Sequence, residues 1–263
     1  MKLGLIGAGN MAQAIVRGLE KTQTLTGADI ILHGGHPTNY EPVAASLGAT
    51  AVASNLAVYE ASDLVILAVE PSLAATVAAE LKPALAQQKP LVSLLTGVAL
   101  ADLQAAVGSV DYPLVRVMPN LNVEIGEGMT AYAANAAGEK YLPDVLSLFG
   151  AIGDTIALPE KDFSTFVALA GSSPAFVYMF IDAMARAGVK YGLTKQAATA
   201  IAAQAVLGSG AMVKASEASP FDLMDKVSSP GGTTVAGVIA MESAGFMPAV
   251  FKGIDATINK DRG

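Results

Sequence analysis

The first half of the chain alternates short apolar runs with helical segments, and this alternation constrains the fold more than any other feature. The apolar runs are rich in Leu, Ile and Val, and they predict buried strands over residues 3–6, 30–33, 64–69, 91–95 and 114–118. Helical patterns lie between them, over residues 11–20, 42–47, 72–85 and 100–107. Elements in this order form βαβ units, so we expect an α/β domain with a Rossmann-like, mostly parallel sheet covered on both faces.

A change of pattern near residue 158 predicts a second domain. Two more short strands, residues 128–132 and 155–158, are expected at the edge of the sheet, with a helix over residues 140–149 between them. Every later segment predicts helix, over residues 162–187, 194–215, 221–227, 234–244 and 248–259. We therefore expect the α/β domain over residues 1–158 and an all-helical domain over residues 159–263.

The helical domain is so apolar that we expect it to be covered by another subunit. Hydrophobic residues make up 52% of the chain and charged residues 15%, and the mean hydropathy is +0.48. Residues 163–181 and 196–213 carry no charge. Both are marginally short for a membrane span of about 20 residues and contain polar or helix-breaking residues. We expect no membrane span, and instead a homo-oligomer that packs through its C-terminal helices, a helical dimerisation domain.

The charged and metal-binding side chains argue against several functions. A net charge of −7 argues against a nucleic-acid partner. The chain has no Cys and only two His, so disulfides, thiolate zinc sites and a Cys nucleophile are excluded and no metal site is expected. A chain free of Cys suits a reducing compartment, and we expect a cytoplasmic location.

A glycine-rich turn joins the first predicted strand to the first predicted helix. Its residues are Gly7, Ala8, Gly9, Asn10, Met11 and Ala12, in the pattern Gly-x-Gly-x-x-Ala. The first Gly permits a tight turn, the second lets a pyrophosphate approach the backbone, and the small third position allows close helix packing. Backbone N–H groups at the start of the helix would bind the phosphates. The position between a strand and a helix predicts dinucleotide binding by Gly7, Ala8, Gly9, Asn10 and Met11.

The end of the second predicted strand favours NADPH, with NADH as the alternative. Asp29 has the spacing of a ribose-binding acid but precedes that strand. Residues 33–38 contain neither an acid nor an Arg. Without a carboxylate there is no repulsion against a 2′-phosphate, which backbone N–H groups, Thr38 and His36 can bind. A solvated loop histidine is the alternative interpretation of His36.

Further candidates follow the ends of the other predicted strands. In open α/β sheets, ligands bind at the carboxyl ends of the strands, where Pro and Gly expose the backbone. The predicted cofactor contacts there are Ala68, Val69, Glu70, Pro71, Thr96 and Gly97, with Asn55 on a preceding loop. Asn120, after the fifth strand, is a predicted substrate contact. Each of these residues taken alone is typical of an ordinary turn.

A second glycine-rich turn lies in the helical half, directly before the predicted helix at residue 234. The candidate substrate-binding residues in it are Ser229, Gly231, Gly232, Thr233 and Thr234. Two glycines free the backbone at a helix start, which is a cradle suited to a carboxylate. A single Ser or Thr there is an ordinary helix cap, but a cap requires only one hydroxyl. Upstream, Gly171 and Pro174 interrupt a predicted helix, which indicates close packing or a ligand nearby.

Four segments together resemble pyrroline-5-carboxylate reductase. They are GLIGAGNMA from residue 4, RVMPN from residue 116, GEGMT from residue 126 and SPGGTTVAG from residue 229. The resemblance covers the whole chain in order, and the last segment is its most specific part. It implies NAD(P)H-dependent reduction of a cyclic imine to L-proline, the last step of proline biosynthesis, in a dimer or a ring of dimers.

The resemblance also implies roles for single residues. The Thr234 hydroxyl would donate a hydrogen bond to the imine nitrogen, and the N–H groups of Gly231, Gly232 and Thr233 would bind the substrate carboxylate. The chain departs from the family pattern at Glu70, where a Lys is usual, and at Val167, where a Thr is usual. Other departures are Ala170, Ser173, Leu121 and Asn122. Glu70 is unsuited to phosphate, while none of these residues carries the hydride chemistry.

Two other functions remain as alternatives. A β-hydroxyacid dehydrogenase shares this domain order but usually needs a Lys base on the first helix of its second domain, and residues 162–181 contain no Lys. A non-catalytic NADPH-binding regulator is the second alternative. Glu160, near the domain junction, is a weaker candidate for placing substrate or water, with a surface role as the other interpretation.

Overall fold

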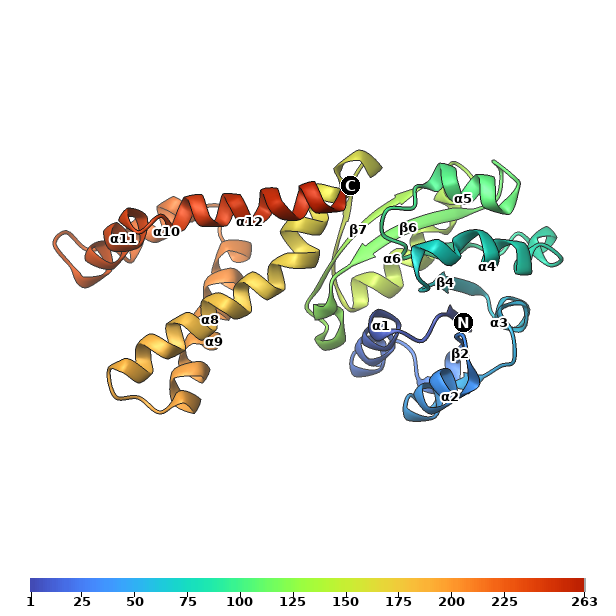
Figure 1. Ribbon diagram of the computed structural model, residues 1–263, viewed down its shortest axis with the longest axis horizontal. Helices are drawn as coiled ribbons and strands as arrows, with labels where there is room; N and C mark the ends of the chain where they lie inside the picture. The colour runs from blue at the N-terminus through green and yellow to red at the C-terminus, as the bar shows by residue number, and fades with distance from the viewer. Residues whose placement is uncertain (263) are drawn as a thin grey trace. The chain divides into compact units, whose positions relative to one another are not determined.

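The computed structural model describes residues Met1–Arg262 and divides into two compact units. Unit 1 comprises Met1–Gly171 together with the residues from Asp261 onward, and unit 2 comprises Ser172–Lys260. The sheet lies in unit 1, and unit 2 is helical (Figure 1). The fold class expected from the sequence is therefore confirmed.

Eight strands form one sheet in the order β3-β2-β1-β4-β5-β6-β7-β8. The strands are β1 (Leu3–Ile6), β2 (Ile30–His33), β3 (Thr50–Ala51), β4 (Leu64–Leu67), β5 (Leu91–Ser93), β6 (Leu114–Pro119), β7 (Gly128–Ala134) and β8 (Gly153–Ala157). All neighbours are parallel except β6 and β7, which run antiparallel. On the two sides of β1, the strands follow one another along the chain in opposite directions across the sheet. Doubly wound sheets open a ligand crevice at such a position.

Helices cover both faces of the sheet (Figure 1). They are α1 (Asn10–Lys21), α2 (Pro37–Ser46), α3 (Asn55–Ala61), α4 (Ala74–Leu81), α5 (Leu100–Val107) and α6 (Leu142–Ala151). Short 3-10 turns are Gly27–Asp29, Pro71–Leu73, Leu85–Gln87, Leu121–Ile125, Glu139–Tyr141 and Glu160–Asp162. Strand side chains alternate between the faces: Leu3 and Leu5 pack with α1 and α6, whereas Ile6 packs with α3, α4 and α5.

Three details of unit 1 differ from the sequence predictions. β3 and α3 were not expected, because β3 has only two exposed residues and α3 only seven. Ser54 caps α3 by accepting a hydrogen bond from the Ala57 N–H at 3.1 Å, so Asn55 begins a helix rather than lying in a loop. Of the two expected edge strands, β8 is at the edge, but β7 lies inside the sheet between β6 and β8.

The long helix expected over residues 162–187 is divided into three parts. They are α7 (Phe163–Phe166), a π-helix (Val167–Ser172) and α8 (Ser173–Lys190). Pro174 therefore stands in the first turn of α8, where a missing N–H is tolerated, rather than inside a regular helix. Phe163 and Phe166 are buried against β6 and β7, so the division between the units falls after Gly171, later than the boundary at residue 158.

Unit 2 contains α8, α9 (Lys195–Ala215), α10 (Pro220–Lys226), α11 (Thr233–Ser243) and α12 (Phe246–Asp261). α8 and α9 form an antiparallel hairpin in which Gly188 approaches Ala198 closely: a Cβ on this glycine would lie 2.9 Å from the Ala198 Cβ. The rings of Phe180 and Phe246 are 6.0 Å apart and join α8 to α12.

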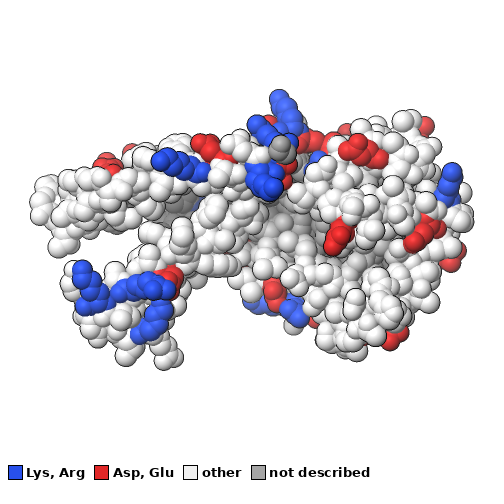
Figure 2. Space-filling view, viewed as in Figure 1, with Lys and Arg blue, Asp and Glu red and all other residues white. Residues whose placement is uncertain are grey.

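Unit 2 has almost no core of its own. Among its described residues, only Ala185, Ala198 and Ala202 are buried, and large apolar side chains are exposed along its helices. The visible surface of α10 and α11 is mostly uncharged, whereas Lys and Arg side chains gather on the end of the α8–α9 hairpin (Figure 2). By length and composition, Glu160–Lys190 and Lys195–Ala215 could each cross a membrane, and α11 with α12 would make a third span bent by 51°. Large exposed apolar surfaces of this kind are typical of sites that contact another protein or a membrane.

Candidate functional site

The glycine-rich turn after β1 adopts a conformation that depends on Gly7. Gly7 has φ +114°, and a Cβ there would lie 2.2 Å from the Ala68 carbonyl oxygen. Its N–H donates to the His33 carbonyl at 2.8 Å. The turn is therefore held between the ends of β2 and β4, and only glycine fits at this position.

The next residues leave room for a ligand at the start of α1. Apart from Gly9 itself and its two chain neighbours, no described heavy atom lies within 4 Å of where a Cβ of Gly9 would stand. Gly9 is the N-cap of α1, and no side chain among the described residues caps this helix. The N–H groups of the first turn, which includes Asn10 and Met11, are thus free to bind an anion such as a pyrophosphate. Ala12 is buried, as close helix packing requires.

The ends of β1, β2 and β4 meet at this turn. A Cβ on Gly34 would lie 2.9 Å from the Ala8 nitrogen, so the turn after β2 packs directly on the glycine-rich turn. Ala68 and Val69 touch Gly7 from the other side and are half-buried. The structure therefore brings together the predicted cofactor residues of three separate strand ends.

His36 begins α2 instead of standing free in a loop. Its Nδ1 pairs with the Thr38 hydroxyl at 2.9 Å, and it is the N-cap of the helix. Both side chains are exposed. They lie at a helix N-terminus next to the turn that contains Gly34, which is a favourable place for a phosphate.

Three other predicted cofactor residues have less direct support. The Asn55 side chain donates to Glu80 Oε2 of α4 at 2.6 Å, so this amide joins two helices. Glu70 and Pro71 are exposed at the start of a 3-10 turn after β4. Contact between these residues and a cofactor stays a prediction.

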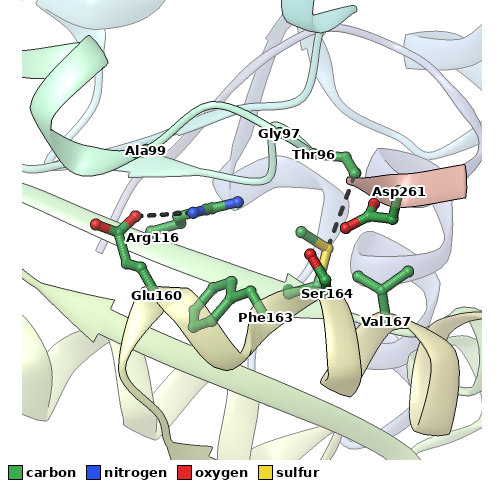
Figure 3. A pocket seen from close by; sticks show the side chains of 10 residues that line it. Thr96, Gly97, Ala99, Arg116, Glu160, Phe163, Ser164, Val167 and Asp261 are labelled. Atoms are coloured by element: carbon green, nitrogen blue, oxygen red, sulfur yellow. Dashed lines mark hydrogen bonds and ion pairs between the residues drawn. The ribbon is translucent and has the colours of Figure 1, made fainter. Parts of the chain in front are cut away.

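A cavity of about 160 Å³ opens beside the loop between β5 and α5. Its lining residues are Thr96, Gly97, Ala99, Arg116, Met118, Glu160, Phe163, Ser164, Val167 and Asp261 (Figure 3). A cavity of about 150 Å³ is large enough to hold benzene, so this space suits one six-membered ring. Thr96 and Gly97 are exposed on the loop, and Gly97 has φ +73°.

A buried ion pair forms one wall of this cavity. Arg116 of β6 is only 6% exposed, and its Nη1 donates to Glu160 Oε1 at 2.8 Å (Figure 3). The same carboxylate oxygen accepts the Leu100 N–H at 2.9 Å, so Glu160 also holds the first turn of α5. The Arg116 guanidinium lies 4.6 Å from the centre of the Phe163 ring, a cation–π contact.

Asn120 is buried at the end of β6 and binds the backbone on both sides. Its Nδ2 donates to the Ala170 carbonyl of the π-helix at 2.9 Å, and its Oδ1 accepts the Met129 N–H at 3.2 Å. These bonds make Asn120 a support for the π-helix. Direct contact with a substrate, expected from the sequence, stays a prediction.

The second glycine-rich turn lies in unit 2 and precedes α11. The Gly232 N–H donates to the Ser229 carbonyl at 2.9 Å, which closes the turn, and Gly231 has φ +70°. Gly232 is the N-cap of α11, and no described side chain caps the helix. Thr233 and Thr234 are exposed in the first helical turn. Free N–H groups and hydroxyls at one helix start can bind a carboxylate.

Sequence reasoning missed the role of Arg116 and left that of Glu160 open. One feature of the sequence could have indicated a role for Arg116, since it is a charged residue inside an otherwise apolar strand. A charge in such a buried position needs a partner. Its partner, Glu160, lies 44 positions further along the chain. Among the described residues, no group of three His, Cys, Asp or Glu side chains is arranged to hold a metal ion.

Comparison with protein families gives two matches. Residues 160–263 match the family described as pyrroline-5-carboxylate reductase dimerisation. Residues 2–97 match the family described as NADP oxidoreductase, coenzyme F420-dependent.

Similar proteins extend over the whole chain. A pyrroline-5-carboxylate reductase from Pisum sativum is 36% identical over 99% of this chain and 94% of its own length. A crystal structure of 1-pyrroline-5-carboxylate reductase from Streptococcus pyogenes is 39% identical, with a TM-score of 0.85 over 99% of this chain and 98% of that one. The Plasmodium falciparum pyrroline carboxylate reductase with NADP bound is 30% identical, with a TM-score of 0.85 over 99% and 97%.

Proposed function

This chain belongs to the pyrroline-5-carboxylate reductase family, and from that premise we propose how its residues reduce 1-pyrroline-5-carboxylate to L-proline with NADPH. The observation that carries the proposal is a pair of uncapped helix starts, one after β1 in unit 1 and one before α11 in unit 2. The first suits the phosphates of a dinucleotide, and the second suits the carboxylate of a small substrate.

The cofactor is held by the ends of the parallel strands. Gly7–Met11 bind the pyrophosphate through backbone N–H groups, and the open space at Gly9 fits its close approach. His36 and Thr38 bind the 2′-phosphate at the start of α2, which supports NADPH as the cofactor. We assign the contacts nearer the nicotinamide to Ala68–Pro71, Thr96 and Gly97, at the ends of β4 and β5, and a further cofactor contact to Asn55. NADPH, when bound, supplies the hydride that reduces the imine carbon.

The substrate is held by the turn before α11. The N–H groups of Gly231, Gly232 and Thr233 bind its carboxylate, and Ser229 shapes the turn. Thr234 donates a hydrogen bond from its hydroxyl to the ring nitrogen. A neutral hydroxyl is sufficient when the bound imine is already protonated, so the chain needs no strongly perturbed acid.

The enzyme works as an oligomer, and we assign the contact to the C-terminal helices. The exposed apolar side chains of α8, α9 and α12 support this assignment, because a second copy would cover them. Covering by a second copy also accounts for helices that are apolar enough to span a membrane, so no membrane is required. The absence of Cys supports a cytoplasmic location, and the net charge of −7 supports the absence of a nucleic-acid partner.

The decisive experiment mixes the protein with 1-pyrroline-5-carboxylate and NADPH and follows the loss of absorbance at the reduced nicotinamide band. We expect rapid oxidation of NADPH and formation of L-proline. A parallel assay with NADP⁺ and a series of 2- and 3-hydroxy acids tests the dehydrogenase alternative. Turnover confined to the hydroxy acids would replace the proposal, and cofactor binding without any turnover would indicate a regulator.

A further inference from the structure

The cavity beside the β5–α5 loop has an unusual set of charged side chains for a pocket that would take the uncharged ring of a reduced nicotinamide. Among its described lining residues, the charged side chains are the Arg116 guanidinium and the carboxylates of Glu160 and Asp261. Arg116 is buried, whereas 28% of the Glu160 side chain is exposed. A buried cation costs a large desolvation free energy, which an apolar residue of similar size would avoid.

Packing alone does not explain why Arg116 and Glu160 stand in this wall. The Arg116 Nε is buried and meets no acceptor among the described residues, so the guanidinium is only partly satisfied. Glu160 holds the N–H of Leu100, but a neutral side chain with a carbonyl oxygen would do the same. What Glu160 adds beyond a neutral acceptor is a negative charge 2.8 Å from Arg116.

The charge matters because the two forms of a nicotinamide ring differ in charge. The oxidised ring carries a positive charge that the reduced ring lacks. An unbalanced Arg116 in the wall would therefore repel the oxidised ring and leave the reduced ring almost unaffected. The cavity is large enough for one six-membered ring, and Thr96 and Gly97, the expected nicotinamide contacts, form part of its lining.

We infer that Glu160 is a positioning residue that balances the charge of Arg116 in the wall of the nicotinamide pocket, and so sets the relative affinity for NADP⁺ and NADPH. The inference rests on the proposed function, since it needs the nicotinamide in this cavity. The inference concerns the binding of NADP⁺, the oxidised product of the reaction, as well as the binding of NADPH. Glu160 acts through Arg116 and through the electrostatic potential of the pocket, and needs no contact with the substrate.

The test measures two dissociation constants for the purified full-length protein, one for NADPH and one for NADP⁺, by calorimetry at fixed salt. Glu160→Gln keeps an oxygen for the Leu100 N–H and removes the charge. We expect the ratio of the NADP⁺ constant to the NADPH constant to rise about five- to tenfold, as for a unit charge a few ångströms away in a partly solvated site. Arg116→Met, which removes the opposite charge, should lower the same ratio.

The ratio of the two dissociation constants should change in opposite directions in these two variants. Structural damage would instead weaken the binding of NADPH and NADP⁺ alike, so the opposite changes distinguish an effect of charge from damage. The double variant Arg116→Met with Glu160→Gln has the same net lining charge as the wild type, because Asp261 is unchanged, so its ratio should return to within about twofold of the wild-type value. The double variant also tests the effect of charge if Arg116→Met alone does not fold. Asp29→Asn is the matched control, since Asp29 pairs with Lys2 at 3.6 Å at the amino-terminal ends of β1 and β2, whereas Thr96 and Gly97 of the cavity follow the carboxyl end of β5.

The outcomes separate this inference from the proposed function. A wild-type protein that fails to reduce 1-pyrroline-5-carboxylate overturns the proposed function, while the binding ratio is still measurable. An active wild-type protein with an unchanged ratio in Glu160→Gln overturns the role of Glu160 alone. A ratio that rises equally in Asp29→Asn would also overturn it, because the effect would then follow from net charge and not from the pocket.

Discussion

The Asn120 side chain shows how one buried amide supports the π-helix at the end of unit 1. Its two hydrogen bonds hold β7 and the π-helix, which ends at the division between the units. The wider turn of a π-helix leaves backbone carbonyls in need of other donors, and Asn120 satisfies the Ala170 carbonyl. The same residue follows directly on β6, one of whose residues is Arg116.

Replacing Asn120 by Ala should destabilise the protein by about 1–3 kcal/mol, because the partly buried Met129 N–H and Ala170 carbonyl lose their partner. Urea unfolding at a fixed protein concentration measures this change. Lys82→Ala, at an exposed position at the end of α4, is the control and should change the free energy of unfolding by less than about 0.5 kcal/mol. A loss in Asn120→Ala no larger than in the control would show that these bonds contribute little.

Thr234 tests the proposed chemistry at a single hydroxyl. Thr234→Ala should lower kcat/KM for 1-pyrroline-5-carboxylate by about 10- to 100-fold, which corresponds to one or two useful hydrogen bonds. Thr234→Ser retains the hydroxyl and should keep most of the activity. Steady-state kinetics with saturating NADPH measures both variants, and near-normal turnover in the alanine variant would remove Thr234 from the mechanism.

Single residues could be predicted from the sequence where a local pattern carries the information. Gly7 and Gly9 belong to a short motif whose geometry is local, and the structure shows the tight turn and the open space that the motif predicts. The pairing of Arg116 with Glu160 depends on how β6 meets a turn that follows β8. No local pattern encodes that contact, so the sequence shows only that the buried Arg needs a partner.

At the scale of elements, the α8–α9 hairpin is held by an exposed carboxylate between two cations. Asp182 accepts hydrogen bonds from Arg186 on its own helix and from Lys195 at the start of α9. These bonds, first that of Arg186 and then that of Lys195, lower the pKa of Asp182 from 3.8 to about 2. The folded hairpin therefore favours the ionised carboxylate.

A lowered pKa predicts a stabilisation that is complete above the unfolded pKa and is lost as the pH falls through the folded value. The difference in Tm between the wild type and Asp182→Asn should thus be present at pH 6 and shrink between pH 3.8 and about 2. Thermal unfolding followed by circular dichroism measures it. Glu242→Gln on α11 serves as the exposed control. A difference that persists at the lowest pH would contradict the assigned pairing.

The apolar pattern of the sequence predicted the types of the elements, but it did not predict the π-helix. Residues 163–190 have a helical composition throughout, and only Gly171 and Pro174 indicate an interruption. The kind of interruption depends on packing: Phe163 and Phe166 fix α7 on the sheet, and Asn120 holds the widened turn. β3 was missed for a related reason, because two exposed residues owe their pairing to β2 and carry no pattern of their own.

At the scale of the whole molecule, the two units differ in how they obtain their stability. Unit 1 buries large side chains on both faces of its sheet, whereas the described part of unit 2 buries only three alanines. Helices of this length without a buried face gain little from helix propensity alone. We proposed that unit 2 depends on a second copy of the chain for its stability, and its exposed apolar side chains support this.

This dependence can be tested with a charge placed on an exposed apolar residue of each unit. Leu207 on α9 is 62% exposed and Val110 in unit 1 is 72% exposed, so a lone chain should tolerate Glu at either position. If α9 packs against a second copy, Leu207→Glu buries an unpaired charge there and should raise the dimer dissociation constant about 30-fold or more, whereas Val110→Glu should not. Light scattering over a dilution series gives the mass, expected to be at least twice the 26.6 kDa of one chain for the wild type. A wild-type monomer at micromolar concentration, or equal dissociation in both variants, would show that the apolar helices are covered in some other way.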